Sequence, residues 1–219
     1  MSAGIHPLAS VIAAVARGIS GVQVRWTGCR PEEKQRIYFA NHTSHLDFVV
    51  LWSALPGEVR ARTRPVAAKD YWEAGLRAYL AQKVFRAVLI HRGGTAQAAG
   101  KEETRAAART VIDQLAEAMG ETESLILFPE GTRGTGETIA PFRSGLYYLA
   151  KSKPEVELVP AHLENLNRIL PKGEVLPVPL ISLLTFGAPM RIGETEEKRD
   201  FLERARAAVC GLRRGENGR

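Results

Sequence analysis

Short apolar runs that favour β-strands alternate along the chain with segments of helical periodicity, and this alternation limits the possible folds. The strand-like runs lie at residues 22–26, 37–40, 66–69, 84–90, 124–128, 157–160 and 181–186. The helical segments lie at residues 5–19, 44–55, 72–81, 101–119, 142–151 and 195–212. Alternating strands and helices predict an α/β fold with a mostly parallel central sheet flanked by helices on both faces. Functional sites in such folds lie at the carboxyl ends of the parallel strands.

The length of 219 residues suits a single domain spanning residues 1–219. Residues 1–20 contain a predicted amphipathic helix, whose apolar stripe either packs on the core or lies on a membrane surface. We expect residues 213–219 to form a flexible tail. The uncharged stretch 175–190 contains three prolines and is shorter than the ~20 apolar residues that a membrane span needs. The sequence therefore predicts no transmembrane helix.

The balance of charges favours an anionic partner. The chain has 30 lysine and arginine residues against 24 acidic residues, which gives a net charge of +6. Phosphates, acidic lipids and nucleic acids all suit such a charge, although solubility explains many of the individual residues. Nucleic acid is the weakest of these candidates, because the basic residues are scattered without an RNA-binding or helix-turn-helix signature. Cys29 and Cys210 form neither a CxxC pair nor a disulfide framework, which fits a reducing compartment.

A histidine and an aspartate lie close together at the junction that follows the strand-like run 37–40. His42 follows the run, and Ser44 then opens the helical segment that contains Asp47. In one regular helix, residues five apart point ~140° away from each other, so the two side chains could not meet. They meet if His42 lies in the turn and Asp47 in the first turn of the helix. The carboxylate would then fix the imidazole tautomer and stabilise its protonated form, as in a general base that removes a hydroxyl proton.

Two other interpretations compete with this general base. Ser44 is a candidate helix N-cap with Asp47 as the acid of a capping box, which leaves His42 as an ordinary junction residue. Alternatively, His42, His45, Asp47 and His162 supply ligand types of a zinc site. The HExxH pattern is absent, so we predict no metal site.

Four short motifs resemble those of the glycerolipid acyltransferase family, typified by 1-acyl-sn-glycerol-3-phosphate acyltransferases. They are Asn41-His42-Thr43-Ser44-His45-Leu46-Asp47, Val88-Leu89-Ile90-His91-Arg92, Phe128-Pro129-Glu130-Gly131-Thr132-Arg133 with Phe142-Arg143-Ser144-Gly145 downstream, and Val159-Pro160-Ala161. The Ala68-Lys69 segment between the first two motifs is a further similarity. The first and third motifs, in this order and at this separation, make the resemblance specific, and it covers roughly residues 35–165.

The resemblance implies a glycerol-3-phosphate acyltransferase-like fold and O-acyltransferase activity. The enzyme would move a fatty acyl group from an acyl thioester to the free hydroxyl of 1-acyl-sn-glycerol-3-phosphate, making phosphatidate. The catalytic pair would be His42 as base and Asp47 as the residue that orients and charges the imidazole. The expected substrate-binding residues are Lys69, Arg92, Glu130, Gly131, Thr132 and Arg133. Arginine forks hold phosphate bidentately, which makes Arg92 and Arg133 the leading phosphate ligands.

The resemblance also implies the partners and the setting of the protein. Acyl-CoA or acyl-carrier protein would donate the acyl group as a substrate, and no cofactor is expected. The acceptor would be a lysophospholipid at the membrane surface, and the enzyme would be peripheral on the cytoplasmic face. Residues 175–190 would then line an acyl groove or belong to the ordinary core.

Two alternatives to this function stay open. The chemistry is unchanged if the acceptor is another lysophospholipid or lyso-lipid, because its headgroup would also satisfy the basic residues. A non-catalytic lipid- or phosphate-binding module belongs to a different class, and the presence of both His42 and Asp47 disfavours it.

Overall fold

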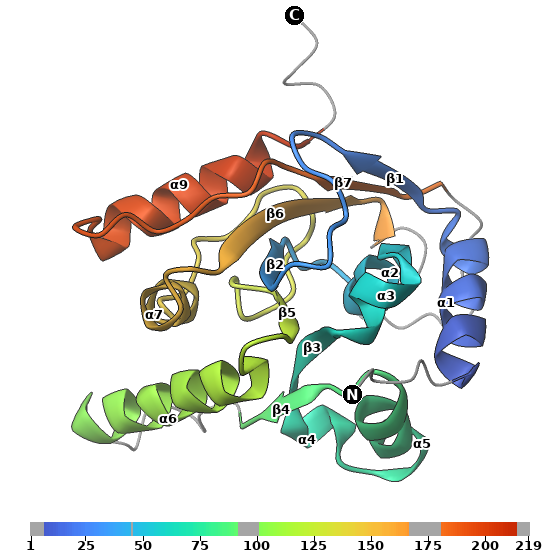
Figure 1. Cartoon of the computed structure of the whole chain (residues 1–219), viewed down its shortest axis with the longest axis horizontal. Helices are drawn as coiled ribbons and strands as arrows, with labels where there is room; N and C mark the ends of the chain where they lie inside the picture. The colour runs from blue at the N-terminus through green and yellow to red at the C-terminus, as the bar shows by residue number, and fades with distance from the viewer. Residues whose placement is uncertain (1–6, 45, 92–100, 167–180, 214–219) are drawn as a thin grey trace, which may run out of the picture.

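The computed structural model describes residues 7–44, 46–91, 101–166 and 181–213 (Figure 1). The strands are β1 (Gln23–Trp26), β2 (Arg36–Ala40), β3 (Thr63–Ala68), β4 (Val88–Ile90), β5 (Ser124–Leu127), β6 (Glu157–Glu164) and β7 (Leu183–Phe186). The helices are α1 (Pro7–Ser20), α2 (Asp47–Ala54), α3 (Gly57–Ala61), α4 (Lys69–Trp72), α5 (Gly75–Tyr79), the π-helical turn η1 (Leu80–Val84), α6 (Lys101–Met119), α7 (Gly145–Ser152) and α9 (Lys198–Cys210).

The strands form a seven-stranded sheet in the order β1-β7-β6-β2-β5-β3-β4. Strands β6, β2, β5, β3 and β4 run parallel to one another. Strand β7 pairs antiparallel with β6 and parallel with β1, so β1 and β7 run opposite to the other five strands. The predicted mostly parallel sheet is therefore confirmed. The carboxyl ends of the five parallel strands lie at one edge, which is where a site is expected.

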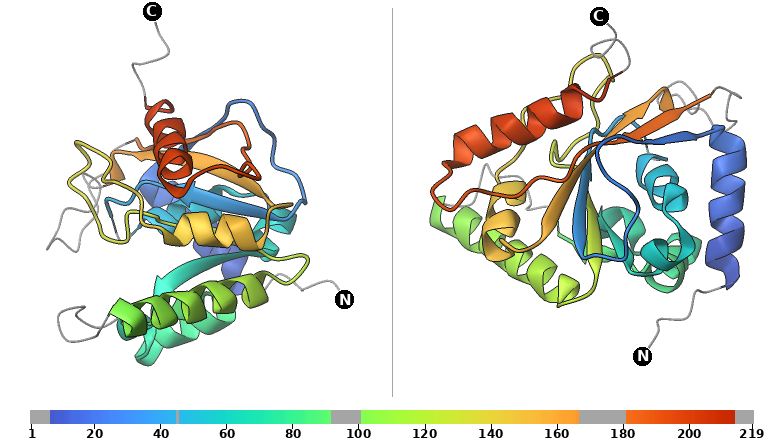
Figure 2. Two further views of the ribbon diagram at one scale, coloured as in Figure 1. Left: turned by 90° about the vertical axis from the view of Figure 1, so that its left-hand side faces the viewer. Right: turned by 45° about the horizontal axis from the view of Figure 1, so that its top comes forward.

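Helices cover both faces of the sheet, as Figures 1 and 2 show. The central strand β2 is buried along its whole length and supplies both layers. Tyr38 and Ala40 pack into the layer formed with α1, α2 and η1. Ile37 and Phe39 pack into the opposite layer with α6, α7 and α9. This alternation follows from the strand period of two residues, and burial on both faces explains why the run 37–40 is continuously apolar.

The segment between β3 and β4 differs from the sequence prediction. A single helix over residues 72–81 was expected, but the chain forms the short helices α4 and α5 followed by η1. Gly75 starts α5 with φ +58°, a left-handed conformation that interrupts a continuous helix. The strand predicted over residues 84–90 is shortened to β4, because Val84 ends η1 and Arg86 also has a positive φ of 50°.

Strand β6 is longer than the predicted run 157–160. It continues past Pro160, which has no N–H to donate, because its pairing partner changes there. Residues up to Ala161 pair with β2, and residues from Ala161 onward pair with β7. The Pro160 carbonyl accepts a hydrogen bond from the Gly187 N–H at 2.8 Å. As a result His162 lies inside β6, whereas the strand-like run predicted over residues 157–160 ends before it.

Helix α1 packs its small residues inward and leaves large apolar side chains outside. Ala9 and Ala13 are buried in the layer that also contains α2. Val11, Val15 and Ile19 are 57%, 54% and 46% exposed, and their spacing of four residues places them along one side of the helix. None of the described helices is long and apolar enough to span a bilayer.

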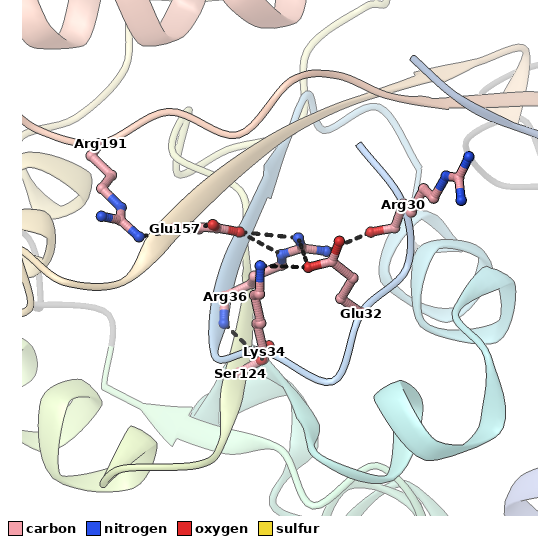
Figure 3. A network of polar contacts seen from close by, with 7 residues as sticks. All are labelled: Arg30, Glu32, Lys34, Arg36, Ser124, Glu157 and Arg191. Atoms are coloured by element: carbon pink, nitrogen blue, oxygen red, sulfur yellow. Dashed lines mark hydrogen bonds and ion pairs between the residues drawn. The ribbon is translucent and has the colours of Figure 1, made fainter. Parts of the chain in front are cut away.

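An ion-pair network around the buried Arg36 lies at the amino-terminal edge of the sheet (Figure 3). The Arg36 guanidinium, at the start of β2, donates from Nε to Glu157 Oε2 at 3.0 Å and from Nη1 to the Arg30 carbonyl at 2.7 Å. Glu32 pairs with Lys34 at 2.7 Å and with Arg36 at 3.4 Å. These contacts tie β2, β6 and the preceding loop together. The side chains that carry the motifs lie at the opposite edge.

Candidate active site

Residues that follow the carboxyl ends of neighbouring parallel strands form two contacting pairs, which contain the predicted site residues Lys69, His42 and Glu130. Ala68 and Ile90 are the last paired residues of β3 and β4, and Lys69 and His91 follow them. Lys69 Nζ lies 3.3 Å from His91 Nε2. Glu130 follows β5, and its Oε1 accepts the His42 backbone N–H from the end of β2 at 2.7 Å. The predicted gathering of strand ends at one edge is thus observed.

His42 and Asp47 are in contact at the junction between β2 and α2, in the arrangement predicted from their spacing. His42 lies in the turn after β2, and Asp47 is the first residue of α2. The distance between His42 Nδ1 and Asp47 Oδ2 is 2.8 Å. Asp47 is fully buried, while the His42 side chain is 19% exposed. A buried carboxylate therefore contacts one nitrogen of a histidine that solvent reaches, and Nε2 has no protein partner among the described residues.

A single oxygen of Asp47 makes all the contacts that the structure records for this carboxylate. Oδ2 accepts the Thr43 N–H at 2.5 Å and the Ser44 N–H at 2.8 Å in addition to facing His42. Oδ1 is buried without a hydrogen-bond partner. The two oxygens therefore do not divide the helix contacts and the imidazole contact between them. The same atom orders the turn and touches the histidine.

The helix starts later than the N-cap interpretation assumed. Helix α2 begins at Asp47, with Leu46 at the cap position and no side-chain cap hydrogen bond. Ser44 is therefore not the residue that precedes the regular helix. Its Oγ accepts the Leu46 N–H at 3.3 Å, and its own N–H is bound by Asp47. Asp47, the predicted capping-box acid, thus stabilises the turn that holds His42. Its contacts with the backbone of this turn do not prevent its contact with the imidazole.

The His42 backbone and ring are fixed from three sides. Its N–H donates to Glu130, and its carbonyl accepts the Gly134 N–H at 2.8 Å. Its imidazole stacks on the Phe128 ring, with centroids 4.4 Å apart and planes 23° apart. The neighbouring Asn41 side chain binds both the N–H and the carbonyl of Leu163 at 2.8 and 2.9 Å, which joins the end of β2 to β6.

The third motif forms a tight loop around Glu130 and Gly131. Glu130 is 4% exposed, and its Oε2 accepts the Ala140 N–H at 2.9 Å. Gly131 has φ +72°, and a Cβ placed on it would lie 2.5 Å from Arg143 Nε. Arg143 Nε also donates to the Glu130 carbonyl at 3.2 Å. A side chain at position 131 would therefore displace Arg143, which explains the glycine.

The predicted cations that the structure describes come from different segments of the chain. Arg133 and Thr132 are exposed in the loop that follows β5. Lys69 pairs with Glu73 at 3.4 Å besides its contact with His91. No hydrogen bond or ion pair joins Lys69 or Arg133 to His42 within the described parts of the chain. Arg92 lies outside the described residues.

The zinc interpretation finds no support in the parts of the chain that are described. Within them, no group of three or more histidine, cysteine, aspartate or glutamate side chains could hold a metal ion. His45 lies outside the described residues. His162 is buried in β6, where its Nδ1 lies 3.5 Å from Glu164 Oε1. Burial lowers the pKa of His162, and the nearby Glu164 carboxylate partly opposes this effect.

Three residues that contribute to this site had no role in the sequence prediction. Asn41 and Phe128 fix the His42 junction, and Arg143 covers Gly131. All three belong to the quoted motifs, so their positions were visible in the sequence. Their contacts were not, because each partner comes from a different strand end or loop.

The fold and the site can now be compared with known proteins: the chain has an α/β sheet, and a histidine–aspartate pair lies at the carboxyl end of its central strand. The family model described as Acyltransferase matches residues 21–164. The chain belongs to this acyltransferase family, as its motifs predicted. The match covers the first, second, third and fourth motifs together.

Individual relatives agree with this family. The chain is 29% identical over 173 residues to a 1-acyl-sn-glycerol-3-phosphate acyltransferase of Limnanthes douglasii, covering 78% of this chain and 56% of the relative. It is 29% identical over 157 residues to the 1-acyl-sn-glycerol-3-phosphate acyltransferase alpha of Homo sapiens, covering 70% of this chain and 49% of that protein. The chain thus spans about half the length of the curated relatives it matches.

A solved structure shows the same fold. The crystal structure of the 1-acyl-sn-glycerophosphate (LPA) acyltransferase PlsC from Thermotoga maritima matches with a TM-score of 0.66. The match covers 94% of this chain and 77% of the PlsC chain at 17% sequence identity. The predicted acyltransferase-like fold is therefore confirmed.

Proposed function

We propose that this protein is an O-acyltransferase that moves a fatty acyl group from an acyl thioester to the free hydroxyl of 1-acyl-sn-glycerol-3-phosphate. The observation that carries the proposal is the 2.8 Å contact between His42 Nδ1 and Asp47 Oδ2, inside the region that the family model matches. The names of the relatives support this acceptor.

The chemistry assigned to the pair is general-base catalysis. His42 Nε2 takes the proton of the acceptor hydroxyl while the hydroxyl oxygen attacks the thioester carbonyl carbon. Asp47 stabilises the positive charge that forms on the imidazole. The tetrahedral intermediate then expels the thiolate, which receives the proton from His42. The products are an ester and a thiol, and the sequence of steps needs no covalent enzyme intermediate.

The acceptor's phosphate requires cations near this base. Arg133 supports such a role, because its guanidinium is exposed in the loop that also contains Glu130. Lys69, which follows β3 on the other side of β5 from His42, is a further candidate. Arg92 is proposed from its sequence motif. A guanidinium can hold phosphate bidentately, whereas an ammonium acts as a point charge. We assign Thr132 and Gly131 to the same loop contact with the acceptor.

We further propose that acyl-CoA or acyl-carrier protein is the donor, and that the enzyme works peripherally at the cytoplasmic face of a membrane. The exposed apolar side chains Val11, Val15 and Ile19 on α1 support contact with a lipid surface. The net charge of +6 favours anionic headgroups and phosphorylated acceptors.

An acceptor screen with His42→Ala as the reference tests this function. Purified protein is incubated with labelled acyl-CoA and lysophosphatidate, several other lysophospholipids, or water alone. We expect transfer to lysophosphatidate above the rest, and a loss of at least about 10²-fold in His42→Ala, because general-base help is worth ~10²–10⁴ in rate. Full activity in a well-folded His42→Ala protein would contradict the base. Transfer to a different lyso-lipid would keep the chemistry and change the acceptor.

A further inference from the structure

The carboxylate of Glu130 is occupied by the protein backbone. Oε1 accepts the His42 N–H at 2.7 Å, and Oε2 accepts the Ala140 N–H at 2.9 Å. The residue is only 4% exposed. Buried carboxylates with two backbone donors are held in one orientation, and little of this one remains accessible to a lipid acceptor.

The same loop also holds the other side of the His42 peptide. The His42 carbonyl accepts the Gly134 N–H at 2.8 Å, four residues after Glu130. The peptide groups on both sides of the His42 Cα are therefore bonded to one loop. Because the side chain direction follows from these backbone positions, the loop sets where the imidazole points.

Arg143 locks the loop itself. Its Nε donates to the Glu130 carbonyl at 3.2 Å, and its own backbone N–H donates to the Pro129 carbonyl at 2.8 Å. The guanidinium lies so close to Gly131 that a Cβ there would be 2.5 Å from Nε. The orientation of Glu130 is thus fixed at both its backbone and its side chain.

We propose that Glu130 is a positioning residue for His42 and does not bind the acceptor. Its carboxylate fixes the His42 backbone so that Nδ1 meets Asp47 and Nε2 stays directed at the hydroxyl to be deprotonated. This inference rests on the proposed function of His42 as base. It replaces the expectation that Glu130 is a substrate-binding residue.

A positioning role and a binding role predict different kinetics for Glu130→Gln. The amide keeps one acceptor but presents an NH₂ donor to the other backbone N–H, so one of the two contacts must break. A displaced base lowers kcat, and a misplacement of about 1 Å costs about 10²-fold. The KM for the acceptor should stay within about twofold, because no acceptor contact is lost.

The matched control is Glu137→Gln, which neutralises an exposed glutamate of the same loop. We expect this variant to keep the wild-type kcat and KM. An increase of about tenfold in acceptor KM with unchanged kcat in Glu130→Gln would overturn the proposal, since that result identifies a substrate ligand. If Glu130→Gln does not fold, Glu130→Asp gives the same comparison, because it keeps the charge and withdraws both oxygens from the backbone.

A spectroscopic measurement separates this inference from the acyltransferase proposal. Ring ¹⁵N–¹H correlation spectra report the histidine tautomer, and the signals of His42 are those missing from His42→Ala. We expect one tautomer in the wild-type protein, and mixed or exchange-broadened signals in Glu130→Gln. Identical His42 signals in both proteins would overturn the positioning role, whether or not the protein transfers an acyl group.

Discussion

At the scale of single residues, one oxygen atom of Asp47 links the shape of the junction to its chemistry. Oδ2 accepts the N–H groups of Thr43 and Ser44 and also faces His42 Nδ1. The backbone contacts keep this oxygen in place when the imidazole is absent or neutral. A preorganised negative charge of this kind stabilises an imidazolium without having to reorient during the reaction.

The substitution Asp47→Asn separates charge from geometry. An amide oxygen in place of Oδ2 can still accept the two backbone N–H groups, so the turn should keep its shape. The negative charge opposite His42 is lost, and we expect kcat to fall by about 10²–10⁴. Thiol release from acyl-CoA, followed with a thiol reagent, measures this loss, and the thermal midpoint checks the fold.

The control for this substitution is Asp113→Asn, which removes an exposed carboxylate on α6. It should leave kcat unchanged. An Asp47→Asn protein that is folded and keeps more than a tenth of the wild-type kcat would show that the charge of Asp47 does not support the base.

The sequence could predict this pair but not the residues that hold it. A spacing of five residues across a strand-to-helix junction is a local property, so the meeting of His42 and Asp47 followed from short-range geometry. The direction of the Glu130 carboxylate depends on the backbone of His42, which is 88 residues away, and on that of Ala140, at the far end of the following loop. No pattern around Glu130 indicates these partners, and the charged residue type favoured a ligand role instead.

At the scale of secondary-structure elements, most predicted segments were confirmed, and the segment between β3 and β4 was not. Helix α6 was found with the predicted bounds, because residues 101–119 have a clear helical pattern that ends at Gly120. The segment 69–84 instead contains three short helical pieces. Tertiary contacts decide its shape: Trp72, within it, packs edge-on against Phe48 of α2 at 5.5 Å.

Helix α1 carries the element-scale prediction for membrane contact. The double variant Val11→Ser and Val15→Ser removes two exposed apolar side chains without touching the buried Ala9 and Ala13. Fully burying a valine contributes about 1.5–3 kcal/mol, so even partial insertion of the two valines predicts at least about a tenfold loss of vesicle binding in the variant. Sedimentation with sucrose-loaded vesicles containing anionic phospholipid measures the bound fraction.

Tyr148→Ser is the matched control, because Tyr148 is 47% exposed on α7, which covers the opposite face of the sheet. Its vesicle binding should equal that of the wild-type protein. Equal binding of the α1 variant would exclude these valines from the lipid contact, and equal losses in both variants would indicate non-specific adsorption.

At the scale of the whole molecule, the order of elements predicted the layers but not the direction of every strand. Alternating strands and helices require crossovers, and crossovers produce parallel neighbours. The run 181–186 does not indicate whether its strand pairs parallel or antiparallel, since its apolar pattern is compatible with both. Strand β7 joins β6 antiparallel, and this pairing extends β6 far enough to bury His162.

This burial makes the stability of the whole fold depend on pH. His162 is 6% exposed, and burial lowers its pKa below 6.5; the charge of Glu164 opposes this shift, and the charge of Arg213 lowers the pKa further. Below pH 6.5 the unfolded chain therefore binds more protons than the native protein. The stabilisation by the neutral imidazole is complete above the unfolded pKa and is lost as the pH falls towards the folded pKa.

The variant His162→Gln tests this dependence, because glutamine does not titrate. Urea unfolding midpoints at pH 7.5 and pH 5.5 should decrease on acidification in the wild-type protein, and decrease less in the variant. Carboxylates that do not contact His162 contribute to the decrease equally in both proteins, so the difference between the two decreases isolates His162 together with its neighbour Glu164. Equal decreases would show that the His162 proton uptake does not oppose folding. A smaller decrease in His162→Gln would mean that the burial of His162 lowers the stability of the fold in acid. This burial depends on the pairing of β7 with β6, which no local sequence pattern predicts.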